Sequence, residues 1–140
     1  MQVFNLEQEQ EWNPEKQVEK ILGKVAEGDV GGACWEPGQI SAYHCHPGST
    51  EIYFCFRGGG KMRTPERIVD IVPGSFVVHP RGEVHEYVNG PQRTLLFRVR
   101  YGEQMRTRFV ARRQHSDWQQ SPEDAEYFRM HPHLLTAEVS

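Results

Sequence analysis

Glycine and proline recur at short intervals along this chain, and that punctuation constrains its fold more than any other feature. The sequence has 13 glycines and 9 prolines, and the runs between them are short and rich in Val, Ile, Phe and Tyr. Short β-prone runs separated by turn residues are typical of an all-β sandwich or barrel. We therefore expect an all-β sandwich or barrel. The runs expected to form strands cover residues 17–24, 31–35, 40–45, 51–56, 61–64, 67–72, 75–79, 86–88 and 94–101.

A length of 140 residues suits one domain with its own core. We expect three segments, namely an N-terminal arm over 1–14, the barrel over 15–101, and a connector with a C-terminal helix over 102–140. The connector residues 102–120 are charged and predict irregular structure. Ser121 as N-cap, with Pro122 at the first helical position, predicts a short helix over 123–129.

The charge balance argues against several classes of partner. The chain has 16 basic and 19 acidic residues, a net charge of -3 and a pI of about 6.2, whereas nucleic-acid binders usually carry a basic face. No apolar run approaches the ~20 residues of a spanning helix, and the N-terminus lacks the pattern of a signal peptide. An odd number of cysteines, three, favours reduced thiols. We expect a cytoplasmic protein whose partner is a small molecule, not a nucleic acid or a membrane.

Three histidines and one glutamate carry the strongest chemical signal. His44 and His46 are two positions apart, so on a strand both imidazoles point to the same side. Glu51 opens the next run after a Pro-Gly turn, which would bring its carboxylate back beside them. His85 would have to reach the same cavity from a distant strand. Three neutral nitrogens and one carboxylate suit Fe, Mn, Co, Ni, Cu or Zn better than Ca or Mg.

The spacing around these residues follows two motifs. The first is G-x5-H-x-H-x4-E-x6-G from Gly38 to Gly58, and the second is G-x5-P-x-G-x2-H-x3-N from Gly74 to Asn89. At these positions the sequence resembles the cupin superfamily, in particular its small single-domain, metal-binding members. The resemblance implies a cupin jelly-roll, or double-stranded β-helix, with one divalent transition metal such as Fe, Mn, Zn or Ni. It also implies the metal ligands, which are His44, His46, Glu51 and His85. The alternative is a structural cluster without metal, in which hydrogen bonds satisfy the histidines.

The resemblance is less specific for the reaction, because cupins include many enzymes and also binding proteins without activity. We expect an enzyme that chelates a small, oxygen-rich, anionic molecule to the metal, with dioxygenase or isomerase and cyclase chemistry. Glu51 would be ligand first and base second, and Tyr53 or Tyr87 would be the acid partner. The alternative for both tyrosines is a packing role in the core. A small-molecule-binding cupin without turnover, or a metal-stabilised structural or regulatory protein, stays open.

Strand parity divides the remaining residues between the two sides of the barrel wall. Ile52, Phe54 and Phe56 alternate with Glu51, Tyr53 and Cys55. Three large apolar groups on one face need cover from a second sheet or a partner subunit, so we expect a homodimer.

Parity also suggests where the remaining charged candidates point. Arg98 and Arg100 alternate with the apolar Phe97 and Val99, so we expect the apolar face inward and the arginines outward. Pointing inward, the arginines would instead hold a carboxylate. His79 is either a partner of the metal ligands or a residue of the rim. His131 and His133 flank a proline and have no nearby carboxylate, so we expect no second metal site there.

Overall fold

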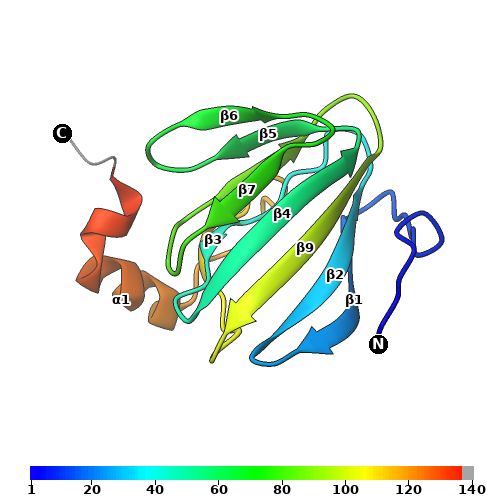
Figure 1. Ribbon diagram of the computed structural model, residues 1–140. Helices are drawn as coiled ribbons and strands as arrows, with labels where there is room; N and C mark the ends of the chain where they lie inside the picture. Colours follow the sequence, from blue (N-terminus) through cyan, green and yellow to red (C-terminus); the bar gives the residue numbers. More distant parts are fainter. Residues whose placement is uncertain (137–140) are drawn as a thin grey trace.

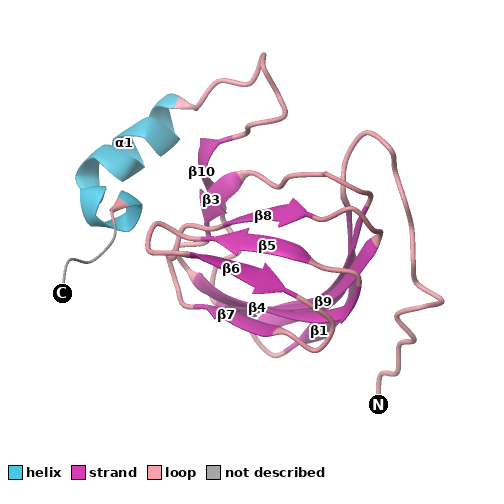
Figure 2. Ribbon diagram, turned by 90° about the horizontal axis from the view of Figure 1, so that it is seen from above, coloured by secondary structure: helices cyan, strands magenta, loops and turns pink. Residues whose placement is uncertain are grey.

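Antiparallel strands form two facing layers in the computed structural model, which describes residues 1–136 (Figures 1 and 2). The first layer is a five-stranded sheet in the order β1-β2-β9-β4-β7. Its strands are β1 (Val18–Val25), β2 (Gly28–Trp35), β9 (Thr94–Gly102), β4 (Ser49–Arg57) and β7 (Phe76–His79). Its five strands form one continuous hydrogen-bonded sheet, so this layer is the more regular wall of the barrel.

The second layer is built from two small sheets that meet at the histidines. One sheet has the order β6-β5-β8 and the other pairs β10 with β3. Single bridges join them, because His44 pairs with His85 and Ile40 with Val88. Its strands are β6 (Ile68–Ile71), β5 (Gly60–Arg63), β8 (Glu86–Asn89), β3 (Tyr43–Cys45) and β10 (Arg108–Ala111). The two layers together confirm the predicted cupin jelly-roll, a double-stranded β-helix.

A triple-glycine turn carries the chain from one layer to the other between β4 and β5. Gly58 and Gly59 have φ of 85° and 137°, which residues with a Cβ rarely adopt. A Cβ on Gly58 would also collide with the carbonyl oxygen of Arg93. Both the backbone conformation and the close approach therefore require glycine at this turn.

The core fills the space between the layers. The ring of Trp35 meets that of Tyr87 edge-on, with centroids 4.7 Å apart. The buried cluster around them consists of Ala33, Trp35, Tyr53, Cys55, Met62, Ile71, Tyr87 and Leu96. Among residues 1–136, no helix is long and apolar enough to cross a membrane.

The C-terminal segment ends in the predicted short helix, α1 (Pro122–Met130), followed by a 3-10 turn, η1 (Pro132–Leu135). Ser121 caps α1, since its side chain accepts a hydrogen bond from the amide of Asp124. Phe128 packs with the buried Cys45, which fixes α1 beside β3 and β10 at one end of the barrel (Figure 2). The boundaries 1–14, 15–101 and 102–140 stay predictions, and residues 137–140 lie outside the described part.

The expectation of an irregular connector over 102–120 is wrong, because this segment contains β10. Arg108 pairs with Cys45 and Phe109 with His44 on β3. The Asp124 carboxylate at the start of α1 accepts hydrogen bonds from the Phe109 amide and the Arg108 guanidinium. A short strand in a charged segment is therefore held by contacts from both of its sides.

The expected direction of the β9 arginines is also wrong. Arg98 is 3% exposed and Arg100 points toward Glu51, so the even-numbered face of β9 lines the interior. Acidic partners make this burial possible, since Arg98 donates to Glu19 at 2.7 Å and lies 3.5 Å from Asp29. Hydrophobic Phe97 and Val99 consequently lie on the outer face.

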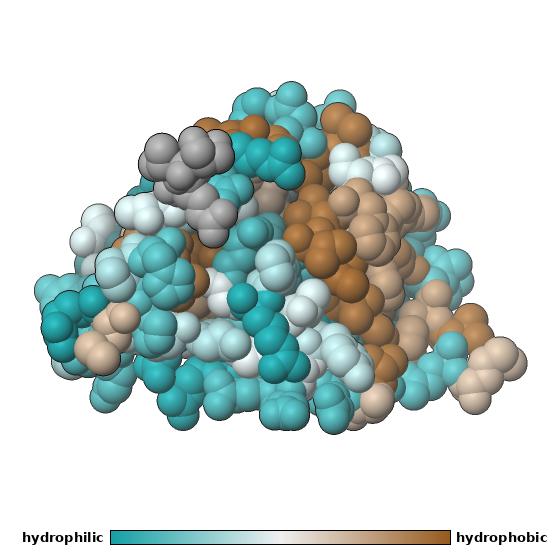
Figure 3. All heavy atoms as spheres, turned by 60° about the vertical axis from the view of Figure 1, so that its left-hand side comes forward, coloured by the Kyte–Doolittle hydropathy of each residue, from teal (hydrophilic) through white to brown (hydrophobic). Residues whose placement is uncertain are grey.

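The outer face of the five-stranded sheet carries two apolar rows that cross its strands. Val30, Val99, Ile52 and Val78 are successive cross-strand partners in one row. The second row consists of Gly32, Phe97, Phe54 and Phe76. Phe76 and Val78 are 65% and 53% exposed, and Figure 3 shows a continuous hydrophobic band on this side of the molecule. We call these eight residues the outer rows.

Candidate metal centre

The four predicted ligands come together between the two layers. His44 lies on β3 and His46 directly follows that strand. His85 is the cross-strand partner of His44, and the two residues exchange backbone hydrogen bonds of 2.8 and 3.1 Å. Glu51 reaches them from β4 in the facing sheet. One ligand atom from each residue lies within 4.8 Å of the other three, so the arrangement is compatible with a single ion.

Backbone and hydroxyl groups orient the three imidazoles from behind. Nδ1 of His44 lies 2.7 Å from the carbonyl oxygen of Ala42, and Nδ1 of His85 lies 3.0 Å from that of Glu83. A carbonyl only accepts, so each of these nitrogens carries the proton. Nδ1 of His46 lies 3.2 Å from the hydroxyl of Thr107. In the neutral rings the Nε2 lone pairs of His44 and His85 are therefore free for a metal.

Electrostatics favour a neutral imidazole at His44 and an ionised carboxylate at Glu51. Burial, with the neighbouring His85 and His46, lowers the pKa of His44 well below its ordinary value of 6.5. Burial alone would raise the pKa of Glu51, but contacts with His46 and His85 hold that pKa well below 4.5. Arg100 adds a third contact, with its Nε 3.0 Å from Oε2 of Glu51. These charge states are the ones that bind a divalent ion.

The donor set fits a divalent transition metal better than it fits a metal-free cluster. Nε2 of His85 lies 3.0 Å from Oε1 of Glu51, and Nε2 of His46 lies 3.3 Å from Oε2. A doubly protonated His85 would donate from Nε2 to this carboxylate, whereas in the neutral ring, with the proton on Nδ1, the Nε2 lone pair faces a carboxylate lone pair. Nε2 of His46 is buried and has no hydrogen-bond partner among residues 1–136. A cation between these atoms satisfies all of them, as three imidazoles and a carboxylate do for such ions.

The cavity beside these residues is small and polar at its mouth. Its volume is about 160 Å³. Tyr53 and Tyr87 line it as predicted, but the Tyr87 hydroxyl donates to Asn89 at 2.8 Å. Burial and the nearby Glu51 raise the pKa of Tyr53 well above 10, so this phenol keeps its proton. Cys55, on the same strand face, packs in the core, and the catalytic roles of Glu51, Tyr53 and Tyr87 stay predictions.

Three residues of the connector line this cavity and were not predicted. Thr107 and Arg112 reach it from either side of β10, and Phe109 of β10 lies against His44 with ring centroids 6.2 Å apart. Their only sequence signal is the β-prone run 108–111 in the connector. Arg100 was considered but expected outward, although it shares a strand face with the buried Leu96.

His79, the last residue of β7, contacts a candidate ligand from behind, which is one of the two alternatives that the sequence left open. Its ring stacks on that of His85, with centroids 3.8 Å apart and planes 8° apart. It is 2% exposed, and its Nδ1 lies 2.8 Å from a carboxylate oxygen of Glu83. The stacking restricts the orientation of the His85 ring.

Comparisons with known proteins agree with this fold and site. A family model described as a cupin domain matches residues 33–97, which include all four candidate ligands. A search of curated proteins gave no match. The family match, the two motifs and the fold identify residues 33–97 as a cupin domain.

Solved structures resemble the chain over most of its length. A protein from Thermus thermophilus is 25% identical with a TM-score of 0.69, over 73% of this chain and 98% of that one. A conserved protein with a double-stranded beta-helix domain from Klebsiella pneumoniae is 16% identical with a TM-score of 0.72, over 79% and 97%. A recombinant oxalate oxidase in complex with glycolate is 18% identical with a TM-score of 0.61, over 70% and 57%. These likenesses concern the fold.

Proposed function

We propose that the protein is a metal-dependent cupin enzyme acting on a small, oxygen-rich organic anion. The observation that carries this proposal is the convergence of three oriented imidazoles and an ionised carboxylate beside an arginine. The cavity of about 160 Å³ suits a molecule of only a few heavy atoms. A bound divalent ion would supply Lewis-acid chemistry, or dioxygen chemistry if it is iron.

The chain's own residues would bind and orient the substrate. Arg100 and Arg112 offer two guanidinium groups at the cavity, which favours a carboxylate-bearing molecule. Tyr53 is a buried phenol that holds its proton at neutral pH and so offers a hydrogen-bond donor to a substrate oxygen. Tyr87 is less available, because its proton is engaged by Asn89. Glu51 is first a candidate ligand, and its contact with Arg100 opposes a role as free base.

Metal analysis of protein purified without added metal, followed by activity assays, tests the proposal. Oxygen uptake by the Fe(II)-loaded protein would be measured with 1,2-dicarbonyl and catechol-like acids. Deuterium exchange into the same compounds would be followed with the Zn, Mn and Ni forms. Uptake supports the dioxygenase branch and exchange supports the isomerase branch. Binding without either reaction would favour the non-catalytic alternative, and a protein that takes up no divalent metal would contradict the proposal.

We also propose that the protein is a homodimer through the outer rows. Phe76 and Val78 are more than half exposed, and all eight positions of these rows are uncharged. An uncharged apolar face is complementary to itself across a two-fold axis, because pairing it with a second copy buries no unpaired charge. The absence of nucleic-acid and membrane partners and the cytoplasmic location stay predictions.

Sedimentation velocity tests the dimer. The double variant Phe54→Ser with Phe76→Ser is expected to be monomeric at concentrations where the natural chain is dimeric. A matched control, Ile68→Ser, removes an exposed apolar side chain from β6 in the other layer and should leave the dimer intact. A natural chain that sediments as a monomer at all concentrations would refute this association.

A further inference from the structure

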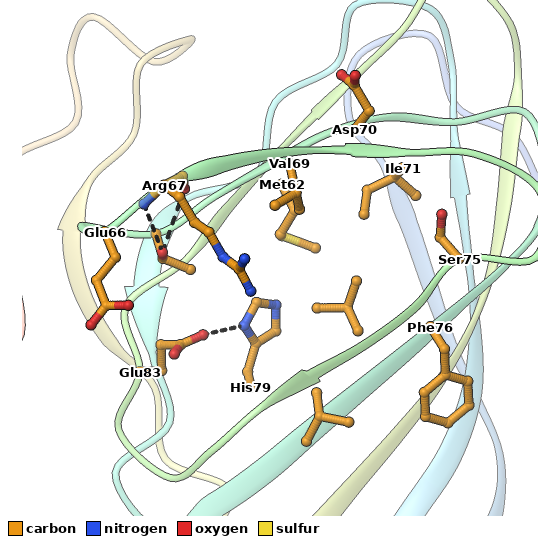
Figure 4. A pocket seen from close by; sticks show the side chains of 13 residues that line it. Met62, Glu66, Arg67, Val69, Asp70, Ile71, Ser75, Phe76, His79 and Glu83 are labelled. Atoms are coloured by element: carbon orange, nitrogen blue, oxygen red, sulfur yellow. Dashed lines mark hydrogen bonds and ion pairs between the residues drawn. The ribbon is translucent and has the colours of Figure 1, made fainter.

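A second cavity lies at the seam where the two layers fail to join. β6 and β7 are edge strands of different sheets, and no strand pairing among residues 1–136 connects them. The space between them has a volume of about 480 Å³. We call it the seam cavity, and Figure 4 shows its lining. Its size is within the range of small-molecule sites.

A buried and unpartnered nitrogen points into the seam cavity. Nδ1 of His79 lies 2.8 Å from the carboxylate of Glu83, which only accepts when ionised, so this nitrogen carries the proton. Nε2 of the neutral ring is then a hydrogen-bond acceptor. It is buried and has no partner among residues 1–136. A buried polar atom left in this state is costly unless another molecule satisfies it.

An arginine lies next to that nitrogen. Arg67, just before β6, extends into the seam cavity toward the ring of His79 (Figure 4). Arg67 forms no ion pair among the contacts of residues 1–136, whereas neighbouring Asp70 is paired with Lys61 at 2.6 Å. The cavity thus presents a cation and a hydrogen-bond acceptor side by side. An oxyanion and a donor on adjacent atoms of one ligand would match them.

The rest of the lining is mixed, because the carboxylates of Glu66, Asp70 and Glu83 and the hydroxyls of Thr64 and Ser75 lie beside an apolar side. Val69 and Ile71 face it from β6, and Val77 faces it from β7. Met62 closes the inner side and also lines the metal cavity. These side chains offer an apolar surface to the body of a ligand whose polar end meets the arginine and the histidine.

The seam cavity is separate from the metal centre but shares a wall with it. His79 is not among the four clustered donors, and it lies against His85 through the stacked rings. Phe76 and Val78 of the outer rows also line its edge, although they point away from the inward-facing Val77 and His79 on the same strand. A ligand here would therefore contact the back of a metal-ligand histidine without reaching the metal.

We propose that the seam cavity is a second binding site, for a short 2-hydroxycarboxylic acid with an apolar side chain. The carboxylate pairs with Arg67, the adjacent hydroxyl donates to Nε2 of His79, and the side chain packs on Val69, Ile71 and Val77. This site is distinct from the one that carries the proposed function, so either can fail without the other.

Methyl NMR of the intact chain, titrated with mandelate, tests the proposal. Mandelate has the hydroxyl, the carboxylate and an apolar ring, while phenylacetate lacks only the hydroxyl. Mandelate should shift the methyl signals of Val69, Ile71 and Val77, and phenylacetate should bind more weakly by about tenfold. Arg67→Met should weaken mandelate by about tenfold or more, and Arg67→Lys should restore part of the affinity.

The matched control is Arg112→Met, which removes the same charge at the metal cavity and should leave mandelate binding in the seam unchanged. Loss of binding in Arg112→Met but not in Arg67→Met would place the acid at the metal cavity and overturn the proposal. Equal affinity for phenylacetate would overturn the role of His79 and with it the ligand class. No methyl shift at up to about 10 mM mandelate would overturn the site altogether.

Discussion

The two faces of the five-stranded sheet contrast in a way that reverses the usual pattern of a small domain. The interior side of one row carries Asp29, Arg100, Glu51 and His79 as successive cross-strand partners. The adjacent outer row carries only Val30, Val99, Ile52 and Val78. Sheets with one covered face usually place apolar groups inward and polar groups outward. In this row the interior holds charges and the surface holds hydrophobes, although the buried apolar cluster around Trp35 fills other parts of the interior.

This difference teaches that the two faces have different requirements. Interior charges are tolerated only because each has an opposite charge or a ring nitrogen within contact distance. That need for compensation fixes Glu51 in place, which is what a metal site requires. The outer rows need no compensation, only an apolar surface to cover them. Interior substitutions should therefore reduce stability or metal affinity much more than neighbouring substitutions on the outer face.

Arg98→Met should cause the largest loss of stability. It removes the cation that faces Glu19 and the buried Asp29, so the Asp29 charge is left without its ion partner. Breaking a buried pair in this way costs about 3–5 kcal/mol. Urea unfolding would measure the loss. The neighbouring outer substitution Val99→Ala should cost about 1 kcal/mol, and equal losses would contradict the contrast between the faces.

Glu51→Gln should mainly change metal binding. The substitution keeps the shape of the side chain but removes the anionic ligand, so affinity for a divalent ion should fall by more than about a hundredfold. Competition with a chromophoric chelator would measure it. Ile52→Val, one residue along on the outer face, is the control and should bind metal like the natural chain. Unchanged metal affinity in Glu51→Gln would refute the assignment of this ligand.

Thr107→Val should have a smaller effect on the same property. The hydroxyl of Thr107 is the only described partner of Nδ1 of His46, so its loss frees the ring to rotate. Loss of such an orienting contact lowers metal affinity by about 10–100-fold. Thr107→Ser retains the hydroxyl and should recover most of the affinity. If Ser and Val at this position behave alike, Thr107 is a packing residue only.

Acidification should destabilise the metal-free protein in two stages. Burial lowers the pKa of His44 well below 6.5 and also lowers that of His79. Below pH 6.5 the unfolded chain therefore binds protons that the folded chain does not, so stability present above that pH declines as pH falls. Glu51, whose folded pKa is below 4.5, adds a second loss below that value. Urea unfolding at intervals from about pH 7.5 to about pH 4 would reveal both stages, and a flat profile would contradict them.

The sequence was sufficient to identify the four clustered donors, because two short motifs contain them. His44 and His46 share a strand face by parity, and the two motifs relate them to Glu51 and His85. It was not sufficient for Arg98 and Arg100, because the rule that apolar faces point inward fails where distant acids neutralise the arginines. Glu19 lies far from Arg98 in sequence, and no local pattern connects the two.

Strand β10 was not predicted for the same reason. Its four residues, Arg108–Ala111, are too few and too charged in context to give an alternating pattern. Their pairing with β3 joins segments that are distant in the chain. Patterns within one sequence reflect the structural preferences of neighbouring residues. The segment that covers the edge of β3 lies more than sixty residues further along the chain, so no local pattern identifies it.

The pairing of β10 with the histidine strand bears on how the protein matures during synthesis. The ribosome has added all four donor residues once it reaches residue 85. The strand that pairs beside His44, β10, and the Thr107 hydroxyl that contacts His46 are added only after residue 106. The donors of a growing polypeptide would therefore be accessible to metal ions before β10 and Thr107 contact the histidines. For a protein that binds a metal at this cluster, selective loading would therefore follow the docking of β10 beside β3.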